Sequence, residues 1–237
     1  MIYITGDMHG DIKQAEKIMK KIIIKPENIL IILGDFSGNY YLNKKDEYFK
    51  NAINEYGIKI FAIRGNHDAN PANVKNISLI KQYNGYGYIE EKFPNIFYAK
   101  NCQNYTIENN EFLVLGGAYS VDKWYRLENN KIWFPDEQMT EEEQKNFLEY
   151  YKNIKIDNIL SHTCPYSIIP KHLFLPQINQ SMVDNRTELF LEEVKNKFHY
   201  NNWFFGHFHA NEKFENNIYM LYDGVIHYKS VGDLKIY

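Results

Sequence analysis

The stretch Ile58-Lys59-Ile60-Phe61-Ala62-Ile63-Arg64-Gly65-Asn66-His67-Asp68 decides how this sequence is interpreted. Its first six residues are mostly apolar and rich in β-branched or aromatic side chains, which predicts a short buried strand. Gly65 then allows a tight turn, and an amide oxygen (Asn66) and an imidazole (His67) follow directly. The order Gly-Asn-His after a strand is difficult to explain as ordinary loop chemistry.

Four other short apolar runs end in the same way, with a small residue followed by a potential metal ligand. They are Ile2–Ile4 before Gly6-Asp7-Met8-His9-Gly10, Ile29–Leu33 before Gly34-Asp35, Ile156–Leu160 before Ser161-His162, and Trp203–Phe205 before Gly206-His207-Phe208-His209. Each run predicts a buried strand. In folds that alternate strands and helices, ligands bind beyond the carboxyl ends of the strands. We therefore expect these strand ends to converge on one edge.

Helix-like stretches separate these runs, which predicts a sheet with helices on its faces. The candidates are Ile12–Ile24, Lys44–Tyr56, Thr140–Tyr151 and Thr187–Phe198. Thr140 and Glu143 form a capping-box signature at the start of the third candidate. Thr187 holds the same place in the fourth, although Phe190 stands three residues later and the acidic residue is Glu188.

The remaining segments predict more strands. Between Tyr83 and Leu115 the short alternating segments predict antiparallel strands at Tyr86–Glu90, Asn95–Tyr98, Tyr105–Glu108 and Phe112–Leu115. The end of the chain, Glu212–Tyr237, predicts hairpins with turns near Asn216-Asn217 and Asp223-Gly224. No internal repeat, low-complexity tract or linker is apparent, so we expect one domain over residues 1–237.

The composition is that of an ordinary globular protein, with 44% hydrophobic and 24% charged residues. The net charge of −3 gives no general attraction to nucleic acid or to a membrane surface. Two cysteines, Cys102 and Cys164, do not make a disulfide scaffold. We expect Cys164 to be a small buried hydrophobe rather than a nucleophile. Without a signal-like start or a long apolar run, the sequence predicts a cytoplasmic protein.

The strand-end motifs bring together imidazoles, carboxylates and one amide oxygen, but no thiolate. This donor set suits Mn, Fe, Co, Ni or Zn more than Cu(I) or an iron–sulfur cluster. Asp7 and His9, like His207 and His209, are separated by one residue and so share a face of an extended segment.

The ordered set GDMHG, GD, GNHD, SH and GHFH, spanning residues 6–209, resembles the calcineurin-like metallophosphoesterase superfamily. The resemblance implies an α/β fold: a four-layer αββα sandwich of two mixed β-sheets flanked by helices. It also implies a phosphoric ester hydrolase with two divalent metal ions. The stretch 116–126, followed by Trp133 and Glu137, further resembles a bacterial subgroup of small metallophosphoesterases.

Carried over by position, the resemblance implies a ligand set in which Asp35 bridges both ions. One ion would be held by Asp7, His9, Asp35 and His209, and the other by Asp35, Asn66, His162 and His207. Mn, Fe, Zn, Co or Ni would serve, with Mn favoured. A metal-bridging hydroxide would attack phosphorus in line with the leaving oxygen, because two such ions lower the pKa of bound water and clamp phosphate oxygens.

The same resemblance assigns three catalytic residues. His67 would donate a proton to the leaving oxygen, Asp68 would orient or stabilise His67, and Arg64 would bind phosphate, to which its planar fork is suited. One departure concerns the second motif. Protein phosphatases of this superfamily continue it as GD-x-x-D-R-G, whereas residues 34–39 read GDFSGN. This departure argues against a phosphoprotein substrate.

Three functions stay open from the sequence. The first is a phosphatase acting on a small phosphorylated substrate or nucleotide; the second is a phosphodiesterase or nuclease that uses the same metal site. The third is a non-catalytic protein-binding scaffold, which is disfavoured because every ligand and His67 are present. Asp122, Lys123 and Arg126 either belong to a solvated segment or line the substrate pocket. The aromatics Tyr83, Tyr86 and Tyr88 either stack on a nucleobase or pack on a strand face.

Overall fold

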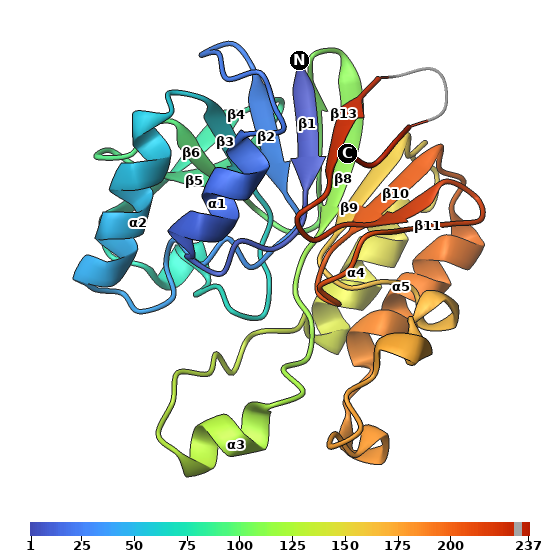
Figure 1. Cartoon of the computed structure of the whole chain (residues 1–237). Helices are drawn as coiled ribbons and strands as arrows, with labels where there is room; N and C mark the ends of the chain where they lie inside the picture. The colour runs from blue at the N-terminus through green and yellow to red at the C-terminus, as the bar shows by residue number, and fades with distance from the viewer. Residues whose placement is uncertain (230–233) are drawn as a thin grey trace.

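The computed structural model describes residues 1–229 and 234–237, and two β-sheets pack face to face at its centre (Figure 1). Within this described part, the first sheet has seven strands in the order β13-β1-β2-β3-β6-β5-β4. Their bounds are β1 (Ile2–Thr5), β2 (Ile29–Ile32), β3 (Lys59–Ala62), β4 (Ile77–Gln82), β5 (Gly85–Glu90), β6 (Ile96–Ala99) and β13 (Val225–Tyr228). Strands β1, β2, β3 and β6 are parallel neighbours, and the flanking strands are antiparallel.

The second sheet has six strands among the described residues, in the order β11-β12-β10-β9-β8-β7. Their bounds are β7 (Gln103–Ile107), β8 (Asn110–Leu115), β9 (Asn158–Ser161), β10 (Asn202–Phe205), β11 (Glu212–Phe214) and β12 (Ile218–Met220). The run from β8 through β9 and β10 to β12 is parallel, and both edges are antiparallel. Both sheets are therefore mixed.

Helices cover the outer face of each sheet, which completes four layers. The helices are α1 (Ile12–Met19), α2 (Lys44–Glu55), α3 (Lys123–Glu128), α4 (Glu141–Tyr151) and α5 (Arg186–Lys197), with short 3-10 turns at Pro71–Asn73, Tyr166–Ile168, Lys171–Leu173 and Gln180–Met182. Helices α1 and α2 pack on the first sheet, and α4 and α5 pack on the second. The αββα sandwich expected from the sequence is confirmed. Helix α3 lies outside these layers (Figure 1).

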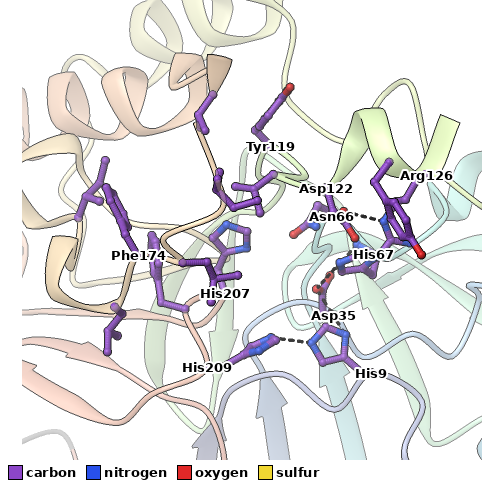
Figure 2. Close-up of a pocket in the computed structure, with 18 of the residues that line it drawn as sticks. His9, Asp35, Asn66, His67, Tyr119, Asp122, Arg126, Phe174, His207 and His209 are labelled. Atoms are coloured by element: carbon purple, nitrogen blue, oxygen red, sulfur yellow. Dashed lines mark hydrogen bonds and ion pairs between the residues drawn. The ribbon is translucent and has the colours of Figure 1, made fainter. Parts of the chain in front are cut away.

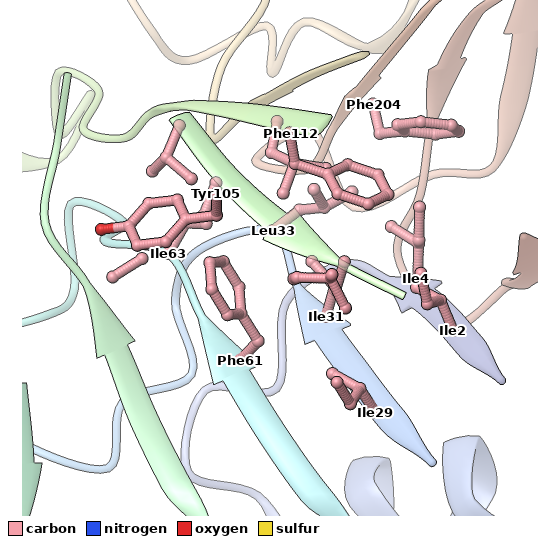
Figure 3. Close-up of a cluster of buried hydrophobic side chains, with 14 of the residues drawn as sticks. Ile2, Ile4, Ile29, Ile31, Leu33, Phe61, Ile63, Tyr105, Phe112 and Phe204 are labelled. Atoms are coloured by element: carbon pink, nitrogen blue, oxygen red, sulfur yellow. The ribbon is translucent and has the colours of Figure 1, made fainter. Parts of the chain in front are cut away.

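Alternation along the strands divides the apolar residues between the layers. In β1 and β2, Ile4 and Ile31 face the partner sheet, while Tyr3 and Leu30 face helices. Figure 3 shows the core between the sheets, where Phe61 from the first sheet lies near residues of the second. Because both faces of these strands are buried, their sequences are continuously apolar rather than alternating. This explains why each predicted strand appeared as a short unbroken apolar run.

The helix predictions were correct in location but not at every end. Helix α1 ends at Met19, five residues before the predicted Ile24. The predicted capping box of α4 is present, with Thr140 and Glu143 bonding to each other's backbone N–H. Helix α5 begins at Arg186, and Asn185 takes the N-cap position. Thr187 is not a cap, because its hydroxyl donates instead to Gln138 Oε1 at 2.8 Å.

The predictions for the middle and end of the chain need correction. The edge strand β4, which is partly polar and exposed, was not predicted. Strands β6 and β8 are antiparallel to one neighbour but parallel to β3 and β9, respectively. The hairpin at Asn216-Asn217 joins β11 and β12 as expected. The turn at Asp223-Gly224 instead carries the chain from the second sheet into β13 of the first. The predicted hairpin region also includes residues 230–233, which lie outside the described residues.

Several smaller expectations can be compared with the structure. Cys102 and Cys164 are both free, and Cys164 is buried in the core beneath α5, as predicted. Tyr83 and Tyr88 pack against the first sheet's cores, while Tyr86 is exposed, so strand packing accounts for the first two. In the described part of the chain, none of the helices is both long and apolar enough to cross a bilayer.

Candidate metal centre

The predicted ligands meet where the parallel strands of both sheets end. Strands β1, β2 and β3 of the first sheet lead to the segments that hold Asp7 and His9, Asp35, and Asn66, respectively. Strands β9 and β10 of the second sheet lead to His162 and to His207 and His209. The carboxyl ends of parallel strands lie at one edge of a sheet. The two packed sheets therefore deliver all of these side chains to one rim of the sandwich.

The first half of the site joins the two sheets through Asp7, His9 and His209. The Nε2 atoms of His9 and His209 are 2.8 Å apart (Figure 2), and His209 Nε2 lies 3.3 Å from Asp7 Oδ2. Asp7 is fully buried, and its Oδ1 accepts the backbone N–H of His207 at 3.0 Å. Its Oδ2 is buried without a hydrogen-bond partner in the described structure. A buried carboxylate oxygen left in this way is costly unless a cation satisfies it.

Asp35 lies between the two halves. Its Oδ2 is 3.7 Å from His9 Nδ1, and its Oδ1 is 3.6 Å from His162 Nε2. The backbone N–H of His67 donates to Asp35 Oδ1 at 2.7 Å, which holds the carboxylate in place. Burial first, and then the charges of Asp7 and Asp68, raise the pKa of Asp35 well above its usual value. A second buried carboxylate near Asp7 is thus unfavourable in the protein alone.

The second half contains a pair of acceptors that face each other. His162 Nδ1 lies 2.7 Å from the carbonyl oxygen of Leu33, so Nδ1 carries a hydrogen and donates it to that oxygen. In the neutral tautomer with this hydrogen, Nε2 is an acceptor, and it lies 2.9 Å from a second acceptor, Asn66 Oδ1. The imidazole of His207 packs against His162 with ring centres 5.0 Å apart.

A chain of hydrogen bonds fixes the orientation of the Asn66 amide. Its Nδ2 donates to Ser120 Oγ at 3.0 Å, so that its Oδ1 faces His162. Ser120 in turn donates to Glu137 Oε2 at 2.6 Å, and Trp133 Nε1 donates to the same oxygen at 2.8 Å. Trp133 and Glu137 therefore act on the site through Ser120.

The backbone of the site is strained and closely packed. His9, Asp35, His207 and His209 all have positive φ angles, between 46° and 69°. A non-glycine residue in this region costs free energy and is concentrated at functional sites. Gly65 is required for another reason, because a Cβ there would lie 2.0 Å from Asp35 Oδ1. The fold therefore bears a local cost in order to aim these side chains.

The pKa shifts of His9, His207 and Asp7 favour metal binding, whereas the raised pKa values of Asp35, caused by burial, and of His209, caused by its contact with Asp7, oppose it. Burial lowers the pKa of His9 to about 4, and burial with the charge of neighbouring histidines holds that of His207 well below its ordinary value. Burial opposes ionisation of Asp7, but the imidazole of His209, 3.3 Å from its Oδ2, and the charges of other nearby histidines outweigh burial and lower its pKa. Neutral imidazoles and ionised carboxylates are the forms that coordinate a cation.

These observations together test whether divalent cations fit. Three groups have ligand atoms within 4.8 Å of one another, and they are Asp7-His9-His209, His9-Asp35-His67 and Asp7-Asp35-His162. They share Asp7, His9 and Asp35, so the donors form one continuous cluster rather than separate pairs. Carboxylate oxygens and imidazole nitrogens therefore converge on one space. This arrangement fits cations with mixed O/N coordination.

The three predicted catalytic residues, Arg64, His67 and Asp68, have different positions relative to the pocket. His67 lines the pocket beside the cluster, with its Nε2 3.9 Å from Asp35 Oδ2. The Asp68 carboxylate accepts the backbone N–H groups of Ser37 and Gly65 at 2.7 and 2.8 Å, so it ties two loops together. Arg64 does not line this pocket. Its Nη2 donates to Asp136 at 2.8 Å and its Nε to the carbonyl oxygen of Asp68 at 3.3 Å.

Arg126 occupies the place expected for a phosphate-binding cation. It lines the same pocket as His67, a cavity of about 1050 Å³. Its Nε donates to Asp122 at 2.7 Å and its Nη1 to Tyr40 and to the carbonyl oxygen of Ile132. Within the described part of the chain, its Nη2 has no hydrogen-bond partner. The sequence left Arg126 undecided because it follows no strand-end motif. Ser120 lies five residues after the end of β8, so inspection of the residues that follow this strand could have identified it.

Burial, together with the positive charge of Arg126, also lowers the pKa of His67 to about 3. Its imidazole is therefore neutral in the protein alone. A phosphate group brought beside it would oppose this effect, because a neighbouring negative charge favours the imidazolium form.

Comparisons with known proteins identify the family and support the fold of this chain. The family model described as calcineurin-like phosphoesterase matches residues 1–211. No curated protein gives a significant match. One solved crystal structure aligns with 100% of this chain and 97% of its own, with a TM-score of 0.58 and 12% identity, which supports the fold alone. The crystal structure of TT1561 of Thermus thermophilus aligns with 93% of this chain and 87% of its own, with a TM-score of 0.49 and 13% identity.

The family match spans every strand-end motif, from Asp7 to His209. It indicates a hydrolase of phosphate esters, and the clustered donors are compatible with the metal dependence of such enzymes. The chain belongs to the calcineurin-like phosphoesterase family.

Proposed function

We propose that this protein is a phosphatase that hydrolyses a small phosphate monoester at a dinuclear metal centre. One observation carries the proposal: buried carboxylates and imidazoles from both sheets converge, and Asp7 Oδ2 has no hydrogen-bond partner in the described structure. Such a cluster is unfavourable without cations, because buried charges need partners. In a non-catalytic protein-binding scaffold, the unfavourable burial of these charged groups would serve no function.

The proposed ligand set is that implied by the sequence. Asp7, His9, Asp35 and His209 would hold one ion, and Asp35, Asn66, His162 and His207 the other. When bound, such ions polarise phosphate oxygens and lower the pKa of water. Nitrogen and oxygen donors without a thiolate favour Mn over softer ions. Trp133, Glu137 and Ser120 keep the Asn66 oxygen turned toward the centre.

The remaining chemistry falls to residues that line the pocket. His67 is the proposed proton donor to the leaving oxygen, since its imidazole borders the cavity beside Asp35. Arg126 is the proposed phosphate anchor, because its guanidinium also borders the cavity. The backbone N–H groups bound by Asp68 hold the loop that carries His67.

The diesterase or nuclease alternative has less support. Nucleic acid is bound through several Lys or Arg contacts to successive phosphates. Among the described residues, Arg126 is the only lysine or arginine that lines the pocket. A small substrate with one phosphate group matches that charge better than a polynucleotide does. The cytoplasmic location expected from the sequence is consistent with this proposal.

We expect Mn²⁺ to raise the melting temperature of the metal-free protein by roughly 5–10 °C at a concentration a hundredfold above its Kd. Asp7→Asn should lose most of this increase, because the variant lacks one buried negative charge in the cluster. Differential scanning calorimetry with and without EDTA measures both. The control is Asp157→Asn, which lies before the opposite end of β9 and should respond to Mn²⁺ as the parent does. Equal increases in Asp7→Asn and the control would contradict the assignment.

We expect Asp35→Asn to reduce hydrolysis of p-nitrophenyl phosphate by about a hundredfold or more, because it removes the charge shared by both proposed ion sites. Its metal-free melting temperature should not fall, since the repulsion from Asp7 is also removed. Bis-p-nitrophenyl phosphate, assayed in parallel, separates monoesterase from diesterase activity. Near-full turnover by the variant in metal-defined buffer would count against the mechanism, and a preference for the diester would favour the alternative function.

We expect His67→Ala to slow alkyl phosphates by roughly 10²- to 10⁴-fold, because their leaving groups need a proton. The loss with p-nitrophenyl phosphate should be far smaller, since p-nitrophenolate leaves without protonation. Steady-state kinetics on both esters gives the two ratios. If the two losses are equal, His67 is not the proton donor.

We expect Arg126→Gln to lower kcat/KM by roughly 10- to 100-fold, the range for losing a hydrogen bond to a charged group. Lys145→Gln, in α4 and not among the pocket-lining residues, is the control and should retain kcat/KM. Arg64→Gln should reduce the melting temperature without raising KM. If KM is raised in Arg64→Gln and not in Arg126→Gln, Arg64 rather than Arg126 binds the phosphate group.

A further inference from the structure

Two segments outside the sandwich extend beside the metal centre and form the outer part of the pocket. One is the stretch 119–126, which includes most of α3, and the other is the stretch 169–183 between β9 and α5. In Figure 1 both extend beyond the same end of the sandwich. In Figure 2 Phe174, from the second segment, lies across the pocket from Arg126 and Asp122 of the first. The cavity thus has a metal-centre floor and two added walls.

The walls carry apolar side chains that belong to none of the three hydrophobic cores found in the described residues. These side chains are Val121, Tyr125, Phe174, Leu175, Ile178 and Val183. Several are exposed, with 53% of Tyr125, 53% of Leu175 and 40% of Val121 accessible to solvent. Helix α3 buries none of its residues. Apolar side chains gathered around a cavity and left in water indicate a binding surface for an apolar group.

Most of the charged side chains that line this pocket lie beside the metal-binding cluster, and the buried Glu188 of α5 lines the pocket as well. Arg126 and the metal-binding cluster lie together, and Asp122 is paired with Arg126 at 2.7 Å. The opposite wall offers the uncharged side chains Gln177 and Gln180 between its apolar residues. The pocket therefore combines an anion-binding floor with walls that are largely apolar.

We propose that the substrate is the phosphate ester of an apolar alcohol, with an alkyl or aryl group that binds between α3 and residues 169–183. The proposal rests on the phosphoesterase function above and names its substrate class. Hydrolysis would form a bond from water oxygen to phosphorus, break the bond from phosphorus to the ester oxygen, and transfer a proton to the released alcohol. The apolar alcohol would remain against the walls until it leaves.

Polyhydroxylated esters fit these walls less well. A sugar phosphate or a nucleotide would bury hydroxyl groups against apolar side chains, and each polar group buried without a hydrogen bond is costly. An alkyl or aryl group loses no hydrogen bonds on entering the pocket. The volume of about 1050 Å³ is well above that needed for a phosphate group with a very short alcohol.

The test is a series of n-alkyl phosphates from ethyl to octyl, assayed with the Mn²⁺-loaded full-length protein. Each compound is also assayed as its methyl diester, so that the result does not depend on monoester preference. We expect kcat/KM to rise about fourfold for each added methylene until the walls are covered. Ribose 5-phosphate, a polar ester of comparable size, should be a poorer substrate than pentyl phosphate.

A pair of variants assigns the effect to the wall. Ile178→Gln should flatten the dependence on chain length, so that kcat/KM falls much more for octyl phosphate than for ethyl phosphate. Met182→Gln is the matched control, because Met182 lies in the same segment, is exposed and does not line the pocket. It should keep the full dependence.

The outcomes separate this inference from the function on which it rests. Absence of metal-dependent hydrolysis of p-nitrophenyl phosphate, its bis ester and every alkyl ester would overturn the proposed function. Hydrolysis of p-nitrophenyl phosphate with no dependence on chain length would overturn only the substrate class. A preference for ribose 5-phosphate over pentyl phosphate would do the same. A chain-length dependence that survives Ile178→Gln unchanged would exclude this wall.

Discussion

The main constraint on this structure is electrostatic: two buried carboxylates and several imidazoles lie together at one rim of the sandwich, and their burial is unfavourable without a counter-charge. Asp7 and Asp35 are almost completely inaccessible to solvent, and each makes ionisation of the other less favourable. Proteins seldom bury such groups without partners. The geometry of two parallel strand sets makes this cluster unavoidable once the sheets pack, because all five strand ends point to the same place. Divalent cations are the simplest counter-charge for this arrangement.

The scaffold and the specificity of the site come from different parts of the chain. The sandwich supplies rigid strand ends, three separate cores and the strained turns that aim the donors. The segments 119–126 and 169–183 add little to those cores and border the pocket instead. Because they carry few of the packing interactions, their residues can vary without loss of the fold. Substrate selection is therefore physically separable from metal binding.

Residues that touch no substrate still determine the geometry. Trp133 and Glu137 control the direction of the Asn66 amide through Ser120, and Asp68 fastens the turns on either side of His67. Residues that are adjacent in the sequence need not interact through their side chains. Asp68 follows His67 directly, yet both of its oxygens accept backbone N–H groups. Arg64 also precedes the motif but is directed away, toward Asp136.

The sequence by itself determined the central strands, the helices that cover them and the convergence of the donors, since strands buried on both faces appear as unbroken apolar runs and each donor follows such a run. The four-layer arrangement was expected only from the family resemblance. The sequence predicted the candidate metal ligands from Asp7 to His209 because each donor lies next to its strand in the sequence. Only the tertiary structure decided which cation borders the pocket. Arg64 and Arg126 are equally suited to phosphate by type, but side-chain direction depends on partners distant in sequence, Asp136 for one and Tyr40 for the other. The apolar walls were likewise invisible, because their residues come from two segments that meet only in space.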